Sequence, residues 1–310
     1  MLTIQEWLTD ATAKLLEAYI SSARLDCLVI LEDTLEKPRE WLLAHSDEDI
    51  SNLKVDILNK RLAQRLKHIP LAYITGHKEF YGRSFLVNPN VLIPRPESED
   101  IIKLLKNVIS ATCTPKHWRR GKARIHNPDW IPDQVGNDNN PPTNHYPLPT
   151  ILDIGTGSGC LAITVKLELP NSQVIAIDNS SRALEVAKQN AKHLDADIEL
   201  KISDLLESVD ISDETVLLVN LPYVPESLIT SEEITKEPSA AIFSGKDGLD
   251  HYKRFWRQLA HTKARDLVII SESLLSQHGE MTNLAKESGF EIDRSHGLAQ
   301  MFVSVYKSGA

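Results

Sequence analysis

The sequence predicts an α/β protein with a mainly parallel sheet covered by helices on both faces, and with a small helical bundle in front of it. From residue 150 onward, short apolar segments alternate with segments that have helical periodicity. Residues 1–70 instead place apolar side chains at helical spacing throughout. Near the end of the chain, two further apolar segments predict an antiparallel pair that closes the sheet, so that the last strand runs against the others.

Residues 1–70 are expected to form three short helices. Thr3 and Glu6 make a capping-box pair at the start of the first helix. The third helix is expected over residues 52–68, because Pro70 follows it. This segment carries no pattern of catalytic residues, so we interpret it as a packing or docking domain.

Residues 71–96 are predicted to form a β-hairpin linker. Short strands are expected over residues 73–76, 80–82 and 84–87, where aromatic and β-branched side chains lie between turn residues. The linker then ends in a proline-rich segment.

Two prolines, Pro94 and Pro96, flank Arg95 and predict a stiff, extended backbone with a charged side chain on it. Glu97 and Glu99 follow in what is expected to be the first turn of a helix, where carboxylates are favourable. We take residue 97 as the start of the main domain.

The main domain, residues 97–310, is interrupted by residues 111–149, which are rich in proline and asparagine and have little apolar periodicity. We expect this stretch to be a disordered surface insertion. Its histidines, His117, His126 and His145, do not have the spacing of metal ligands, and no metal is predicted.

The remaining segments of the main domain alternate in type, as a parallel sheet with crossover helices requires. Strands are expected over residues 151–154, 174–178, 198–202, 215–219 and 267–270, with the closing pair at 289–292 and 301–306. Helices are expected over residues 160–169 and 181–193 and around residues 281–288.

Composition limits the class of protein. The chain has 310 residues, 42% of them hydrophobic and 25% charged, with three cysteines. No apolar run reaches the ~20 residues that span a bilayer, and no signal-peptide pattern is present, so we expect a cytoplasmic protein without a membrane partner. A net charge of -9 disfavours stable nucleic-acid binding.

A glycine-rich turn follows the first strand of the main domain. Its sequence is Gly155-Thr156-Gly157-Ser158-Gly159, and Asp178 ends the next strand. Glycines let the backbone approach a ligand, while an acidic residue at that second position can accept both ribose hydroxyls. The pair predicts an adenosine-type ligand. The glycine spacing differs from the phosphate-binding and dinucleotide patterns, and favours S-adenosylmethionine over NAD.

The tetrapeptide Asn220-Leu221-Pro222-Tyr223 follows a buried strand and is predicted to bind a planar amide nitrogen during its methylation. The Asn220 side-chain oxygen and the Leu221 carbonyl can accept the two N–H donors of such an amide. Tyr223 can stack on the amide plane and exclude water. Asn220 and Tyr223 are therefore the candidate catalytic residues.

Several blocks of the chain resemble the HemK/PrmC family, the peptide chain release factor glutamine N5-methyltransferases. The glycine turn and the tetrapeptide are shared with other exocyclic-nitrogen methyltransferases, whereas the block Pro94-Arg95-Pro96-Glu97 is specific to this family. The matching blocks are residues 70–76, 79–82, 91–99, 152–160 and 237–249.

The resemblance implies a Rossmann-like class I methyltransferase fold that uses S-adenosylmethionine and leaves S-adenosylhomocysteine. It implies that the methyl donor is held by Gly155, Thr156, Gly157, Ser158, Gly159, Asp178, Leu205 and Asn220. The substrate would be the glutamine of the Gly-Gly-Gln motif of release factors, bound by Asn220, Leu221, Pro222 and Tyr223. The N-terminal helices would dock the release factor.

The chain departs from the family pattern at Leu221, where the family has proline, and at Ser273, where it has glycine. Two alternatives therefore stay open. The shared tetrapeptide is compatible with an adenine-N6 nucleic-acid methyltransferase, and Leu221 together with the insertion is compatible with an inactive family member.

Overall fold

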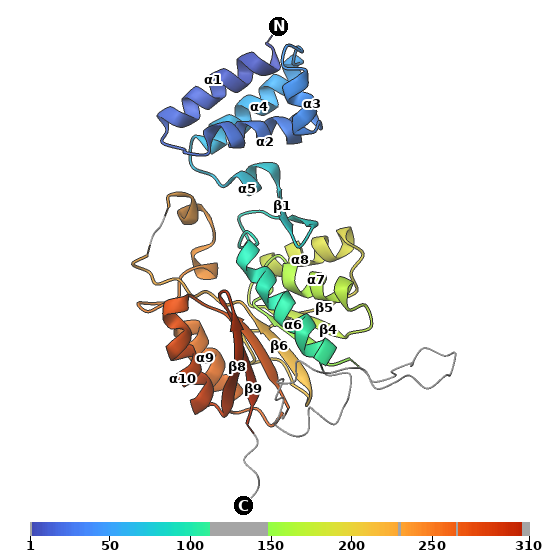
Figure 1. The fold of residues 1–310 in the computed structure, drawn as a ribbon, viewed down its shortest axis with the longest axis vertical. Coiled ribbons are helices and arrows are strands. Elements are labelled where there is room, and N and C mark those ends of the chain that lie inside the picture. The colour runs from blue at the N-terminus through green and yellow to red at the C-terminus, as the bar shows by residue number, and fades with distance from the viewer. Residues whose placement is uncertain (1, 112–147, 229–230, 265, 306–310) are drawn as a thin grey trace, which may run out of the picture.

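The computed structural model describes residues 2–111, 148–228, 231–264 and 266–305. A helical bundle lies at one end, a short linker follows it, and the sheet domain lies at the other end (Figure 1). The predicted insertion falls almost wholly outside the described residues, as do His117, His126 and His145. Among the helices described, none is long and apolar enough to cross a membrane.

The bundle contains four helices, where three were predicted. They are α1 (Ile4–Glu17), α2 (Ala23–Leu35), α3 (Arg39–Ala44) and α4 (Asn52–Arg65). The predicted capping box at α1 is confirmed, since the Thr3 hydroxyl accepts from the Glu6 N–H at 3.2 Å and the Glu6 carboxylate accepts from the Thr3 N–H at 2.8 Å. Helix α3 was missed because its 6 residues are too few to show helical periodicity.

The linker holds a short helix and a hairpin. The predicted strand over residues 73–76 is wrong, because Leu71–Thr75 forms helix α5. Pro70 at its N-cap has a φ of -53°, Gly76 ends it with a φ of 82°, and the Thr75 hydroxyl donates back to the Leu71 carbonyl at 3.2 Å. The hairpin itself is confirmed as β1 (His77–Phe80) paired with β2 (Arg83–Leu86). The strand expected over residues 80–82 is wrong, because Tyr81 and Gly82 form the turn between the two strands.

A short 3-10 turn, η1 (Pro96–Ser98), leads into helix α6 (Glu99–Ala111), as the acidic residues of this first turn predicted. The Glu99 carboxylate also accepts from the Tyr81 N–H at 3.0 Å. This bond fixes the start of α6 against the hairpin.

Within the described residues, the sheet has seven strands in the order β5-β4-β3-β6-β7-β9-β8. Five of them, β3 to β7, are parallel, and β9 is antiparallel to both β7 and β8, which confirms the predicted fold class. Their bounds are β3 (Thr150–Ile154), β4 (Val174–Asp178), β5 (Glu199–Ile202), β6 (Thr215–Val219), β7 (Val268–Glu272), β8 (Phe290–His296) and β9 (Ala299–Ser304).

The chain leaves β3 towards one edge and returns to its other side at β6, so the strand order reverses between these two neighbours. Ligands of open α/β sheets bind at such a reversal, beyond the carboxyl ends of the strands. The glycine turn follows β3 and Asn220 follows β6. The topology therefore brings the two predicted motifs to the same edge.

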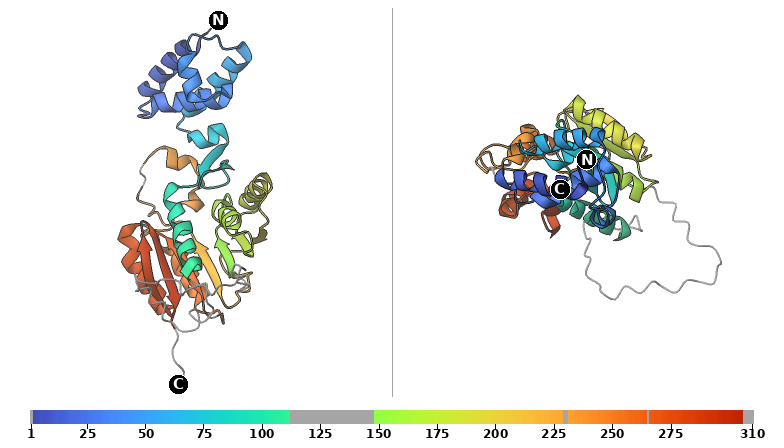
Figure 2. Two further views of the ribbon diagram at one scale, coloured as in Figure 1. Left: turned by 45° about the vertical axis from the view of Figure 1, so that its right-hand side comes forward. Right: turned by 90° about the horizontal axis from the view of Figure 1, so that it is seen from above.

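Helices cover both faces of the sheet (Figures 1 and 2). Side chains of α6 and α7 (Cys160–Glu168) share one core cluster with alternate strand residues such as Ile151. Side chains of α9 (Asp250–Leu259) and α10 (His278–Glu287) share a second cluster with the intervening residues such as Leu152. Helix α8 (Ser181–His193) begins and ends where it was predicted, whereas α9 was not predicted at all.

A buried carboxylate below the glycine turn fixes its shape. Asp153 is 1% exposed, and one of its oxygens accepts from the Thr156 hydroxyl at 2.6 Å and from the Ala162 N–H at 3.2 Å. Burial raises the pKa of Asp153 to about 6, although these two hydrogen bonds act to lower it. Asp153 thus joins the turn to helix α7.

This raised pKa predicts a pH-dependent stability term. Since the pKa of Asp153 is higher in the folded state than in the unfolded state, the term is fully present below the unfolded value and is lost as the pH rises through about 6. The free energy of unfolding, measured relative to that of Asp153→Asn, should fall by roughly 1–3 kcal/mol between about pH 4 and pH 8. Urea denaturation over this pH range measures the difference.

Asn keeps the oxygen that Thr156 and Ala162 use and cannot ionise. A control variant at an exposed position, Asp56→Asn, should instead follow the wild type at every pH. Parallel curves for the wild type and Asp153→Asn would contradict the assignment.

Candidate active site

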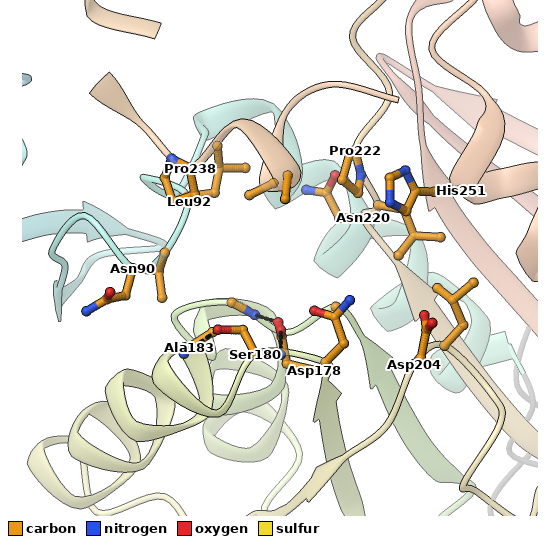
Figure 3. Close-up of a pocket in the computed structure, with 18 of the residues that line it drawn as sticks. Asn90, Leu92, Asp178, Ser180, Ala183, Asp204, Asn220, Pro222, Pro238 and His251 are labelled. Atoms are coloured by element: carbon orange, nitrogen blue, oxygen red, sulfur yellow. Dashed lines mark hydrogen bonds between the residues drawn. The ribbon is translucent and has the colours of Figure 1, made fainter. Parts of the chain in front are cut away.

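A cavity of about 200 Å³ lies beyond the carboxyl ends of β3, β4 and β6. Figure 3 shows its two sides, with Asp178 and Ser180 on one and Asn220 and Pro222 on the other. The predicted residues that line it are Gly155, Gly157, Asp178, Leu205, Asn220, Leu221 and Pro222. The predicted residues that do not line it are Thr156, Ser158, Gly159 and Tyr223.

Asp178 holds the glycine turn against the start of helix α8. Its carboxylate accepts from the Gly157 N–H at 2.9 Å and from the Ser180 N–H at 2.9 Å. Burial raises the pKa of Asp178, and these backbone bonds act against that rise. Each oxygen keeps a lone pair for a further donor, so the residue can still accept from a ligand hydroxyl.

Three residues of the turn support it from behind. Thr156 is buried and binds Asp153, and the Ser158 carbonyl accepts from the Asn190 side chain at 2.8 Å. A side chain on Gly159 would collide with helix α8, since its Cβ would lie 3.1 Å from that of Ala187. These residues shape the cavity without facing it.

Leu205 forms part of the apolar wall through an uncommon backbone conformation. Its φ is 53°, in the left-handed region that non-glycine residues rarely adopt. The buried Ser203 hydroxyl donates to the Leu205 carbonyl at 2.9 Å and accepts from the Ser208 N–H at 3.1 Å. This local network places Leu205 at the cavity, and such strained positions are common at functional sites.

The carboxamide of Asn220 is oriented by Ser98. Its Nδ2 atom donates to the Ser98 hydroxyl at 2.8 Å, across 122 residues of sequence. Because the amide nitrogen is used in this bond, the Oδ1 atom is the group left to accept a hydrogen bond from a ligand. Ser98 is 2% exposed and is the last residue of η1, two residues after Pro96.

Glu272, at the end of β7, lies behind this pair and is fully buried. The Tyr223 hydroxyl donates to it at 2.7 Å. Burial raises the pKa of Glu272, while hydrogen bonds from Tyr223 and Ser98 act to lower it. Tyr223 is therefore tied by its hydroxyl to the sheet.

Leu221 is buried between the glycine turn and helix α9. Its N–H donates to the Tyr252 hydroxyl at 3.3 Å, and that hydroxyl also lies 3.0 Å from the Val219 carbonyl. A Cβ on Gly155 would lie only 3.2 Å from the Leu221 side chain. Leu221 thus packs directly against the glycine turn, and its backbone carbonyl stays available as an acceptor.

A glycine outside the predicted site supports Tyr223. Gly248 has a φ of 78°, and a Cβ there would lie 2.2 Å from the Tyr223 carbonyl oxygen. The same carbonyl accepts from the Gln277 side chain at 2.8 Å. A side chain at position 248 would therefore collide with the backbone of Tyr223.

Much of the remaining cavity wall was missed by the sequence reasoning. It comprises Asn90, Val91, Leu92, Asn179, Ser180, Ala183, Ser203, Asp204, Pro238, Ala240, Ala241 and His251. The blocks at residues 91–99 and 237–249 contain several of these positions, so the resemblance gave a signal that was not used. Asn90, Asn179 and His251 gave none.

Glu237 explains why those two blocks occur together. It is 7% exposed, and its carboxylate accepts from the Arg95 guanidinium at 2.5 Å and from the Ile93 N–H at 3.1 Å. The Tyr73 hydroxyl adds a bond to the Val91 carbonyl at 2.6 Å. The proline-flanked arginine therefore anchors two sides of the cavity wall to each other.

His251 is held in one orientation at the edge of the cavity. The Ser244 hydroxyl accepts from the His251 N–H at 2.9 Å and lies 2.7 Å from the His251 Nδ1 atom. Burial lowers the pKa of His251, and the nearby Arg254 lowers it further. Within the described part of the chain, no group of three or more His, Cys, Asp or Glu residues could hold a metal ion.

Two family models match the chain. The PrmC N-terminal domain matches residues 6–76, and the methyltransferase small domain matches residues 143–240. Among solved structures, the hMettl16 catalytic domain aligns over 84% of the chain and 84% of its own length, at 13% identity and a TM-score of 0.47.

Curated relatives match most of the chain. The bifunctional methyltransferase of Rickettsia bellii is 35% identical over 95% of the chain, although the chain spans only 52% of that relative. The release factor glutamine methyltransferase of Koribacter versatilis is 32% identical, and the match covers 83% of the chain and 81% of that relative. The Bacillus anthracis enzyme of the same name is 31% identical and covers 84% of the chain. The chain therefore belongs to the release factor glutamine methyltransferase family.

Proposed function

We propose that this protein methylates the side-chain amide nitrogen of the glutamine in the Gly-Gly-Gln motif of peptide chain release factors, in the cytoplasm. The observation that carries the proposal is the orientation of Asn220, whose Nδ2 atom is occupied by Ser98 at 2.8 Å. Its Oδ1 atom is thereby presented to an amide N–H at the edge of the cavity. S-adenosylmethionine, when bound, supplies an electrophilic methyl group.

The residues that line the cavity fit that methyl donor. Asp178 can accept from ribose hydroxyls, as the sequence predicted, and the backbone of Gly155 and Gly157 can approach the ligand closely. Leu205 and Leu221 supply apolar surface for a purine. We propose that these residues, with Asn220, hold the cofactor, and that Thr156, Ser158 and Gly159 support the turn.

The substrate amide needs two acceptors and a fixed plane. The lone pair of its nitrogen is delocalised into the carbonyl. Holding the amide in the right orientation therefore contributes more to the rate of methyl transfer than removing a proton beforehand would. We propose that Asn220 Oδ1 and the Leu221 carbonyl accept the two N–H groups, and that Pro222 and Tyr223 border the amide. The bond from Tyr223 to Glu272 would hold that ring in place while the amide binds.

Incubation of the protein with labelled S-adenosylmethionine, a release factor and DNA tests the proposal against both alternatives. Label is expected in the release factor alone. Label in DNA alone would indicate the adenine-N6 alternative. Label in neither, with an active relative as a positive control, would indicate an inactive family member.

Asn220→Ala is expected to lower the transfer rate by about 10²–10³-fold, because one of the two acceptors for the amide is lost. Cofactor binding should be kept at least in part, since Asp178 and the glycine turn remain. Single-turnover kinetics and calorimetry of S-adenosylhomocysteine binding measure the two effects. An undiminished rate would exclude the proposed role of Asn220.

Ser98→Ala is expected to lower kcat by about 10-fold, because the Asn220 carboxamide can then rotate and present its nitrogen to the substrate. The matched control is Ser172→Ala, which removes another buried hydroxyl that donates to a backbone carbonyl at 2.7 Å, outside the cavity lining. The control should keep the wild-type kcat. Equal losses in both variants would show that Ser98 acts only through stability.

Leu221→Pro restores the residue that the family has and is expected to keep or raise the transfer rate, because the acceptor carbonyl remains and the backbone of Asn220 becomes stiffer. It also removes the N–H that Tyr252 accepts. The free energy of unfolding should therefore fall by roughly 0.5–1.5 kcal/mol. A large loss of rate with intact cofactor binding would show that the backbone argument is wrong.

A further inference from the structure

The buried Arg65 forms an ionic contact between the helical bundle and the sheet domain, through Glu233, whose side chain is 39% exposed. Arg65 lies at the end of α4 and is 2% exposed. Its guanidinium donates to the Asp26 carboxylate at 2.6 Å, to the Ile69 carbonyl at 3.2 Å and to the Glu233 carboxylate at 2.5 Å. Two of these partners belong to the N-terminal part of the chain, whereas Glu233 lies 168 residues away.

The contact has a strongly preferred geometry. Asp26 is 4% exposed and also accepts from the Ser22 hydroxyl at 2.9 Å, so its position in α2 is fixed. A planar guanidinium satisfies carboxylates only in particular directions. Loss of one partner leaves a charge poorly compensated in a buried place. A weaker contact next to it joins His68 to Glu232 at 3.4 Å.

Glu233 begins the 3-10 turn η3 (Glu233–Lys236), and the cavity wall follows directly after it. Glu237 binds Arg95 and the Ile93 N–H, as described above, and Pro238, Ala240 and Ala241 line the cavity. Figure 1 shows this segment between the linker and α9. Residues 231–241 therefore contact the N-terminal region through Glu232 and Glu233 and the linker through Glu237.

We propose that Arg65 is a positioning residue. It attaches the bundle to residues 231–241 and so fixes the position of the bundle relative to the cavity wall, as the binding of a protein substrate to both requires. This inference rests on the proposed function, because only a substrate larger than an amino acid can contact both parts. The contact of Glu237 with Arg95 fixes the cavity wall against the linker. The contact of Arg65 with Glu233 then fixes the bundle against the same segment.

Glu233→Ala tests this without removing Arg65, whose loss would also break the bundle through Asp26. Backbone amides of residues 231–236 are expected to exchange hydrogen faster, while those of α1 and α3 are unchanged. KM for the release factor should rise about 10-fold, and kcat and the Kd for S-adenosylhomocysteine should stay within about 3-fold of the wild type. Glu233→Gln, which keeps an acceptor oxygen, should restore part of the KM.

The matched control is Glu32→Ala, which removes a two-bond ion pair with Arg39 inside the bundle. It should change neither the exchange of residues 231–236 nor KM. Unchanged exchange in Glu233→Ala, an unchanged KM, or equal effects in the control would each overturn the proposal. Hydrogen exchange needs no substrate, so its result is separate from the proposed function, which fails if the wild-type protein methylates no release factor.

Discussion

The hydrogen bond from Asn220 to Ser98 is the interaction on which the rest of the site depends. It joins the end of the central strand β6 to the turn that precedes α6. Without it, the carboxamide could present either its oxygen or its nitrogen to a ligand. Glu272 extends the same network to Tyr223, and thereby connects the site to β7. Ser98 thus fixes the Asn220 end of the tetrapeptide, and the buried Glu272 fixes the Tyr223 end.

A second carboxylate, Glu237, stabilises the cavity wall. It ties the proline-flanked Arg95 to the segment that contains Pro238. The family-specific block therefore has a structural reason that is independent of any contact with a substrate. Arg65 then connects this wall to the bundle through Glu233. The bundle, the linker and the sheet domain are joined through two ion pairs, each with one buried partner, Arg65 in one and Glu237 in the other.

Local patterns were sufficient to predict the sheet, the hairpin and the glycine turn. Helix α8 could be predicted with its ends because Ser180 caps it and its apolar positions recur regularly. Helices α3 and α5 could not, because 6 and 5 residues show no period. The strand expected at residues 73–76 gave way to a turn of helix between Pro70 and Gly76. At these places proline and glycine decided the structure, and side-chain propensity did not.

The site was only partly predictable for a different reason. Gly155, Asp178 and Asn220 lie at the carboxyl ends of parallel strands, and the strand order brings these ends together. Their proximity could therefore be predicted from the sequence. The pairs Asn220 with Ser98 and Arg95 with Glu237 join residues 122 and 142 positions apart. No local periodicity predicts such pairs. The position of Tyr223 outside the cavity lining depends likewise on Glu272, a residue of another strand.

The most direct test of the central claim is the location of the transferred methyl group. A release factor incubated with the protein and S-adenosylmethionine can be digested and sequenced by tandem mass spectrometry. We predict one added methyl group on the glutamine of the Gly-Gly-Gln peptide, formed about 10²–10³-fold more slowly when Asn220→Ala replaces the wild type. A methyl group on any other residue, or an equal yield from Asn220→Ala, would contradict it.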